Sequence, residues 1–321
     1  MVAAPHEPRH HLPAPRTALI GRAREIAEVC RLLRRPEARL LVLTGAGGAG
    51  KTRLAIAVAE HLRADFDDAI TFVSLAPISD PALVASAIAQ AIGIRESAER
   101  SLRDGLVAVL VSRRLLLILD NFEHVLPAAR LIDDLLTACP RLTILVTSRA
   151  VLRLSGERNY LVPPLSLPDP QQLPPLEQLG AVEAIQLFVE RAQAAQADFT
   201  LTPDRAVAVA AICRRLDGLP LAIELAAARI SLLSTQALLA RLAHRLQVLT
   251  GGPRDAPARQ QPLRATLAWS YDLLPPATQW LFRQLAVFAG GWTLGAAEAV
   301  CVSGDDIFDG LAALVDYSLV W

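Results

Sequence analysis

The chain has 321 residues, of which 53% are hydrophobic and 20% charged, and its formal net charge is zero at a pI of about 7.0. This length predicts two or three domains of ordinary size. The neutral balance gives no global electrostatic case for binding nucleic acid. No apolar stretch is long enough to predict a membrane span, and residues 1–15 lack the apolar core of a secretory signal.

The cysteines are widely spaced and form no pair that would indicate a disulfide or zinc framework. They occupy positions Cys30, Cys139, Cys213 and Cys301. We expect them to be reduced and mostly buried, which fits a cytoplasmic protein.

The first half of the chain alternates helical and strand patterns after a flexible tail over residues 1–16. Apolar runs predict strands, and between them apolar residues at helical spacing predict helices. This alternation favours an α/β fold with a parallel sheet covered on both faces, and we assign it to one domain over residues 17–162. The predicted strands are Leu40–Thr44, Ala69–Leu75, Leu115–Asp120 and Thr143–Arg149, and the helical segments include one through Ile26 and Leu33, one through Leu54 and Ala59, one from Asp80-Pro81 to Ile92, and Ser101–Val111.

A glycine-rich octet, Gly45-Ala46-Gly47-Gly48-Ala49-Gly50-Lys51-Thr52, lies between the first strand and the following helix. It fits the phosphate-loop pattern G-x-x-x-x-G-K-[ST] at every fixed position, in the strand–loop–helix context that the motif requires. Glycines let successive backbone N–H groups surround an anion, and the helix directs its positive end at the same place. The expected phosphate contacts come from Gly45, Gly47, Gly48, Ala49, Gly50, Lys51, Thr52 and Arg53.

Lys51 is distinguished by composition, because 31 of the 32 basic residues are arginine and Lys51 is the only lysine. A compact ammonium fits a tight backbone cradle that a planar guanidinium fits poorly. We therefore expect Lys51 to bind the β- and γ-phosphates, and the Thr52 hydroxyl to bind Mg²⁺.

Polar residues follow the next strands where they end, and in parallel sheets ligands bind at these carboxyl ends. Asp120 is expected to hold Mg²⁺ together with Thr52. Asn121 stands where many ATP-hydrolysing motors carry a glutamate, and an amide cannot accept a proton. Glu123 is the remaining candidate base, but we expect it to point elsewhere, so hydrolysis is expected to be slow.

Arg149 follows the fourth strand and two hydroxyl residues. A guanidinium at this place can contact the γ-phosphate and so distinguish ATP from ADP. The alternative is a solvent-exposed arginine without a role in the site.

The second half of the chain reads as helical. Proline-rich stretches predict linkers over residues 163–180 and 251–262. Between them, residues 181–250 are expected to form a helical domain, in which Thr202-Pro203, Gly218-Leu219-Pro220 and Ser234 begin helices. Residues 263–321 are again mostly helical, and the apolar end at Trp321 suggests an element that is cut short.

Together these motifs resemble the NB-ARC/STAND family of P-loop signal-transduction ATPases, especially the bacterial branch of LuxR-type and AfsR-like regulators. The resemblance rests on Ile20-Gly21-Arg22, the octet, Leu119 to His124, Thr147-Ser148-Arg149 and Gly218 to Ala222. It covers about residues 12–321. The third residue of the family's Gly-Arg-Glu entry motif is Ala23 here, which leaves the role of that glutamate open.

The resemblance implies a nucleotide-binding domain, a small helical domain and a winged helix that is incomplete at residue 321. It implies that Ile20, Gly21, Arg22 and Pro220 surround adenine, with ATP or ADP and Mg²⁺ as cofactors. It also implies a switch in which ADP holds a closed monomer and ATP permits self-association, within a longer parent chain.

Two other functions remain open. A conventional motor-type ATPase would need a base other than Asn121. A DNA-binding regulator would use the winged helix, but residues 263–321 carry two arginines against six acidic residues. That balance is wrong for a phosphate backbone, so we expect this segment not to bind nucleic acid directly. We also expect no membrane partner, because no apolar stretch is long enough for a span.

Overall fold

The computed structural model describes residues 12–66, 69–94, 101–169, 172–242, 268, 271–288, 291–301, 307–317 and 319–320. The chain divides into two compact units, one formed by residues 1–45 and 51–162 and the other by residues 46–50 and 163–321. The predicted linker over residues 251–262 and most of residues 263–270 lie outside the described residues.

The first unit contains a five-stranded parallel sheet, in the order β2-β3-β4-β1-β5. Every residue of β1 and β3 is buried, as expected for interior strands of a sheet that is covered on both faces. The strands are β1 (Leu40–Thr44), β2 (Ala69–Ser74), β3 (Leu115–Asp120), β4 (Thr143–Thr147) and β5 (Glu157–Leu161).

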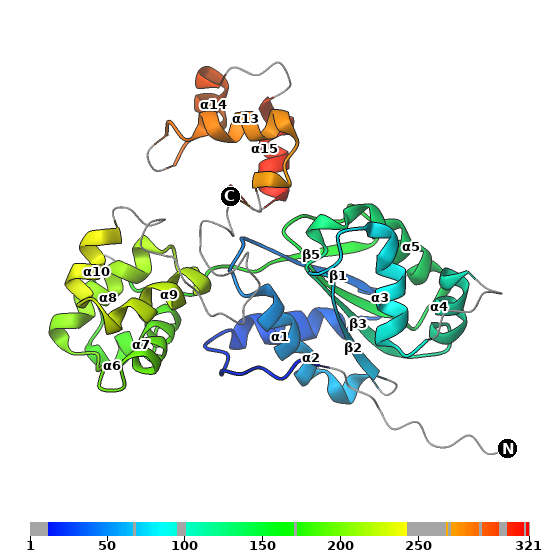
Figure 1. The fold of residues 1–321 in the computed structure, drawn as a ribbon, viewed down its shortest axis with the longest axis horizontal. Helices are drawn as coiled ribbons and strands as arrows, with labels where there is room; N and C mark the ends of the chain where they lie inside the picture. The colour runs from blue at the N-terminus through cyan, green and yellow to red at the C-terminus, as the bar shows by residue number, and fades with distance from the viewer. Residues whose placement is uncertain are drawn as a thin grey trace. The chain divides into compact units, whose positions relative to one another are not determined.

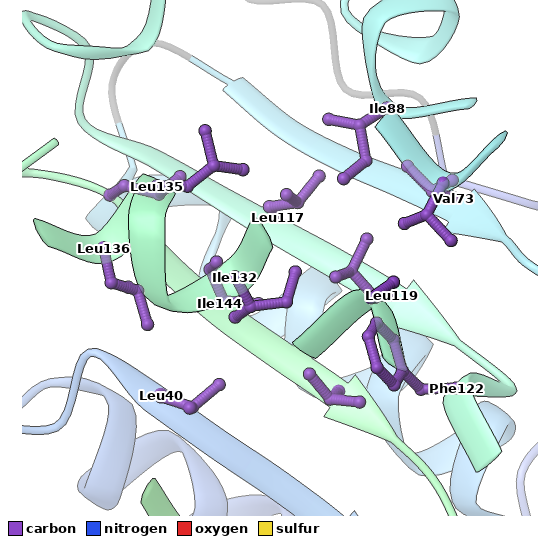
Figure 2. Packing of buried hydrophobic residues seen from close by; sticks show 14 of the residues in the cluster. Leu40, Val73, Ile88, Leu117, Leu119, Phe122, Ile132, Leu135, Leu136 and Ile144 are labelled. Carbon is purple, nitrogen blue, oxygen red and sulfur yellow. The ribbon is translucent and has the colours of Figure 1, made fainter. Parts of the chain in front are cut away.

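Alternate strand residues pack into two separate cores, because successive side chains point to opposite faces of a sheet. One core joins Leu40, Leu117 and Ile144 to the helices α3 (Val84–Ala91), α4 (Leu102–Leu110) and α5 (Ala129–Ala138). Figure 2 shows Leu117, Leu119 and Ile144 gathered with residues of α5 and with Phe122 on this face.

The opposite core joins Leu41, Leu116 and Leu145 to α1 (Ala23–Leu33) and α2 (Lys51–His61). The first unit is therefore a three-layer α/β sandwich, in which α3, α4 and α5 lie on one side of the sheet and α1 and α2 on the other (Figure 1).

The structure differs from the predicted elements of the first unit in three places. Asp80 caps a short 3₁₀ turn, Pro81–Leu83, and α3 begins only at Val84. The strands β2 and β4 end earlier than expected, at Ser74 and Thr147. Strand β5 was not predicted, because its sequence, Glu-Arg-Asn-Tyr-Leu, is mostly polar and its residues are only partly buried or exposed, as suits the edge of a sheet.

The second unit is helical in its described residues. Its helices are α6 (Leu176–Gly180), α7 (Glu183–Ala195), α8 (Pro203–Arg215), α9 (Pro220–Ala227) and α10 (Thr235–Arg241). Phe188 of α7 packs edge-on against Phe199, and Arg191 of α7 bonds to Glu224 of α9 at 3.0 Å. Helix α6 lies inside the segment that we had interpreted as a linker.

Helices α13 (Pro276–Leu285), α14 (Leu294–Val300) and α15 (Ile307–Asp316) form a small core of their own around Leu281, Ala297 and Leu314. The helical C-terminal region is thus confirmed. Within the described part of the chain, no helix has the length and apolar character needed to cross a membrane.

Candidate functional site

The candidate site begins where three neighbouring strands end in buried polar residues. In the sheet β1 adjoins β4, which adjoins β3, and their last residues are Thr44, Thr147 and Asp120. Each is at most 4% exposed. Buried polar groups need partners, and Thr147 supplies one by donating its hydroxyl to Asp120 Oδ1 at 2.6 Å.

The glycine-rich loop has the backbone that its composition predicts. Gly45, Gly48 and Gly50 have φ values of 139°, 85° and 92°, which residues with a Cβ rarely adopt. A Cβ on Gly45 would also lie 2.9 Å from the Val162 carbonyl oxygen. Within the second unit, to which residues 46–50 belong, the Gly48 carbonyl accepts a hydrogen bond from Leu221 N at 3.2 Å.

Lys51 and Thr52 open helix α2 directly after this loop. The Lys51 ammonium donates to the Gly45 carbonyl at 2.6 Å. Burial is the main cause that lowers the pKa of Lys51 to about 8; Arg149 acts in the same direction, while Glu123 and Asp120 oppose it. Three buried ionisable side chains, Arg149, Glu123 and Asp120, therefore lie close enough to Lys51 to influence its charge.

Thr52 and Asp120 form a pair of oxygen donors suited to a hard divalent cation. The Thr52 hydroxyl lies 2.6 Å from Asp120 Oδ1. Burial raises the pKa of Asp120, while hydrogen bonds from Thr147 and Thr52 lower it. Mg²⁺ is often held by one or two protein oxygens, with phosphates and water supplying the rest. This donor set fits that pattern, and the described residues offer no cluster of three or more acidic, histidine or cysteine side chains as an alternative metal site.

The residues after Asp120 bring a second carboxylate back into the cluster. Asn121 has a left-handed backbone (φ 65°, ψ 54°), and its N–H donates to the Thr147 hydroxyl at 3.0 Å. The chain then enters a 3₁₀ turn, Phe122–His124, that buries Glu123. Glu123 Oε1 lies 3.3 Å from Arg149 Nε, and their side chains are 2% and 5% exposed.

The expectation that Glu123 points away from the site is therefore wrong. It assumed that the strand or early-helix geometry continues past Asp120, whereas the left-handed turn at Asn121 redirects the chain. The alternative interpretation of Arg149 as a solvent-exposed residue is also wrong, because its side chain is buried against Glu123.

The entry motif precedes helix α1. Ile20 is 9% exposed, and Gly21 and Arg22 both have positive φ values, of 66° and 68°. The buried Arg22 side chain pairs with Glu25 at 3.3 Å, so the displaced glutamate does contact the motif arginine. In the second unit, Pro220 is the first residue of α9.

The Arg53 side chain, for which we expected a phosphate contact, bonds to the backbone that precedes helix α1. Its guanidinium donates to the Thr17 and Ala18 carbonyls at 2.8 and 2.6 Å. Its phosphate contact, like the adenine contacts of Ile20, Gly21, Arg22 and Pro220, stays a prediction.

Comparisons with known proteins agree with this geometry. A family model described as an AAA domain matches residues 34–159. The Uncharacterized protein Rv0894 of Mycobacterium tuberculosis is 41% identical over 327 residues, covering 100% of this chain and 78% of that protein. The chain belongs to the Rv0894 family and contains an AAA-type P-loop ATPase domain.

Two longer proteins that are named as regulators are also similar to this chain. The Putative HTH-type transcriptional regulator Rv0890c of Mycobacterium tuberculosis is 44% identical over 88% of this chain, and the Regulatory protein AfsR of Streptomyces griseus is 31% identical over 96%. The chain spans only 31% of the length of either regulator. The AfsR-like part of the predicted resemblance is thereby confirmed.

Among solved structures, the ORC2 protein of Aeropyrum pernix has a TM-score of 0.52 at 16% identity, over 93% of this chain and 86% of that one. At this identity the likeness concerns the fold alone, and it confirms the P-loop ATPase fold of the family.

Proposed function

We propose that this chain is the nucleotide-operated switch of a signalling or transcription-regulatory protein of the NB-ARC/STAND type. ATP or ADP binds with Mg²⁺ at the phosphate loop, and the identity of the nucleotide controls domain closure and assembly. Hydrolysis is slow and resets the switch.

One observation carries this proposal. Around the carboxyl ends of β1, β3 and β4, the chain combines a half-buried cation for phosphate (Lys51), an oxygen pair for Mg²⁺ (Thr52 and Asp120) and a buried arginine (Arg149). A third phosphate would meet groups that a diphosphate does not, and differential contacts of this kind are what shifts a two-state equilibrium.

The regulatory part of the proposal draws on the relatives. Two of them are named as regulators, and this chain corresponds to less than a third of their length. In such a parent chain, a nucleotide core of this kind would control other segments. The acidic balance of residues 263–321 favours protein contacts over DNA for the winged-helix segment that the resemblance implies.

The test begins with the nucleotide that the purified protein retains, identified by chromatography after denaturation, alongside a steady-state hydrolysis assay. We expect stoichiometric ADP and a turnover below about one per minute, far under the usual enzyme range. Lys51→Ala should abolish binding, because it removes the ammonium that would form charge-assisted contacts with the β- and γ-phosphates. An empty protein with rapid ATP turnover would favour a motor.

The matched control for that variant is Arg103→Ala on helix α4. It also removes one positive charge, but from an exposed side chain, 54% accessible, that pairs with Asp134. Nucleotide binding should be unchanged. Equal losses in both variants would show that net charge, rather than the phosphate loop, governs affinity.

A further inference from the structure

The site contains a carboxylate, Glu123, that the sequence offered as a candidate base but that we expected to point elsewhere. A water that attacks the γ-phosphate needs a group that accepts its proton. Asn121, directly after Asp120, cannot do this as an amide. Glu123 can, and the left-handed turn at Asn121 places it in the buried cluster around Lys51.

The two oxygens of Glu123 differ in their contacts. Oε1 lies 3.3 Å from both Arg149 Nε and Asn121 Nδ2. Oε2 is buried and has no hydrogen-bond partner among the residues that the structure describes. A buried acceptor without a partner is uncommon and calls for an explanation. One carboxylate oxygen is thus fixed by the protein, while the other remains able to bind a further donor.

A purely structural ion pair does not account for this arrangement. If Glu123 served only to neutralise Arg149, a carboxylate with both oxygens bonded would stabilise the fold better, because an unsatisfied buried acceptor is destabilising. The charge of Glu123 also acts on Lys51, where it raises the pKa against the effect of burial. Glu123 therefore lies near the group that would hold the terminal phosphates.

We propose that Glu123 is the catalytic carboxylate, whose Oε2 orients and deprotonates the attacking water while Arg149 and Asn121 hold Oε1. This inference rests on the proposed nucleotide-binding function. The water oxygen forms a bond to the γ-phosphorus, and the bond from that phosphorus to the β–γ bridging oxygen breaks. ADP leaves with the electron pair, and the water proton passes to Glu123 and then to solvent.

The experiment compares Glu123→Gln with the wild-type full chain in equilibrium ATP binding and single-turnover hydrolysis. The amide keeps the shape but cannot accept the proton, so we expect hydrolysis to fall by about 100-fold or more. ATP affinity should stay within about threefold, because Glu123 contacts the water rather than the phosphates. A hydrolysis rate within about threefold of the wild-type rate would overturn the proposal.

Two further variants separate catalysis from folding. Glu123→Asp keeps the charge beside Arg149 but withdraws the carboxylate by one methylene, so hydrolysis should fall by about tenfold or more with binding intact. Glu60→Gln on α2, where the side chain is 41% exposed and pairs with Arg63, is the matched control and should hydrolyse ATP at the wild-type rate. Loss of ATP binding in both Glu123 variants would show that the residue is structural.

The outcomes also distinguish this inference from the proposed function. A wild-type chain that binds no nucleotide would refute the proposed function itself. A wild-type chain that binds ATP, but hydrolyses it no faster than Glu123→Gln does, would refute the catalytic role and leave the binding function standing.

Discussion

At the scale of single residues, the charge of Lys51 predicts how nucleotide affinity depends on pH. Its pKa of about 8 means that the free protein loses this charge as the pH rises through 8. Bound phosphates favour the charged ammonium, so the complex keeps a proton that the free protein has lost. By linkage, affinity is constant below that pH and falls above it, by up to about tenfold per pH unit.

This prediction is checked by titrating the protein with ADP in the presence of a metal chelator, from about pH 6.5 to about pH 9.5. The chelator removes any contribution from metal ligands. Lys51→Arg is the control, because a guanidinium stays charged throughout. It should bind ADP more weakly and with a flat profile. A flat wild-type profile would show that Lys51 keeps its charge in the free protein.

The oxygen pair of Thr52 and Asp120 leads to a second prediction at this scale, on how ATP binding depends on Mg²⁺. Asp120→Ala should weaken ATP binding in the presence of Mg²⁺ by roughly 10- to 100-fold, the usual effect of disturbing a metal site. Binding without Mg²⁺ should change much less. Calorimetry with and without the cation measures both affinities. Equal losses under the two conditions would count against a metal role for Asp120.

Thr147→Val gives the matched comparison for Asp120→Ala. It removes the hydroxyl that donates to Asp120 and accepts from Asn121 N, but it leaves the carboxylate in place. We expect a smaller loss of Mg²⁺-dependent affinity than in Asp120→Ala. It should also perturb the turn that positions Glu123.

At the scale of elements, the sequence predicted those parts of the site that depend on local pattern. The glycine-rich octet predicted the phosphate loop, and apolar runs predicted β1, β3 and β4 with the polar residues that follow them. It did not reveal β5, because an edge strand with a polar sequence has no apolar run. It did not single out α5 either, although Ile132, Leu135 and Leu136 carry a helical spacing that could have indicated it.

The position of Glu123 could not be predicted for a different reason. It depends on the backbone of one residue, Asn121, whose φ of 65° is uncommon for any residue other than glycine. Asparagine is among the residues that tolerate this region best. The signal available in the sequence was therefore an asparagine directly after a strand, which permits such a turn without requiring it.

Glycines in two elements give opposite predictions for the same substitution. Gly45→Ala should destabilise the first unit by about 1–3 kcal/mol, because its backbone is strained for alanine and the new Cβ would lie 2.9 Å from a backbone oxygen. Gly105→Ala in α4 should stabilise it by about 0.5–1 kcal/mol, since a Cβ there meets no atom within 4 Å and alanine favours helices.

Hydrogen exchange, measured by mass spectrometry on peptides from β1 and α4, would test these two predictions. Exchange should be faster in Gly45→Ala and slower in Gly105→Ala than in the wild type. Tryptophan fluorescence would not report on the first unit, because all four tryptophans belong to the second unit. They lie at positions 269, 280, 292 and 321. Slower exchange in Gly45→Ala than in the wild type would contradict the assigned backbone of the loop.

At the scale of the whole molecule, zero net charge removes one barrier to self-association, since like-charged chains repel one another. The proposed switch then makes assembly depend on the nucleotide. With ADP the chain should remain monomeric, and with a non-hydrolysable ATP analogue its mass in light scattering should at least double. The proposed reason is that a third phosphate would contact Arg149, whose side chain is 5% exposed, where a diphosphate would not, and would so favour a different state.

Glu123→Gln makes this last prediction sharper, because it should hold ATP without hydrolysing it. ATP itself should then sustain the larger species, whereas in the wild type the species should decay as ADP accumulates. Lys51→Ala, which binds neither nucleotide, should remain monomeric throughout. Assembly in that variant, or equal masses with ADP and the ATP analogue, would show that association does not depend on the nucleotide and would remove the switch from the proposed function.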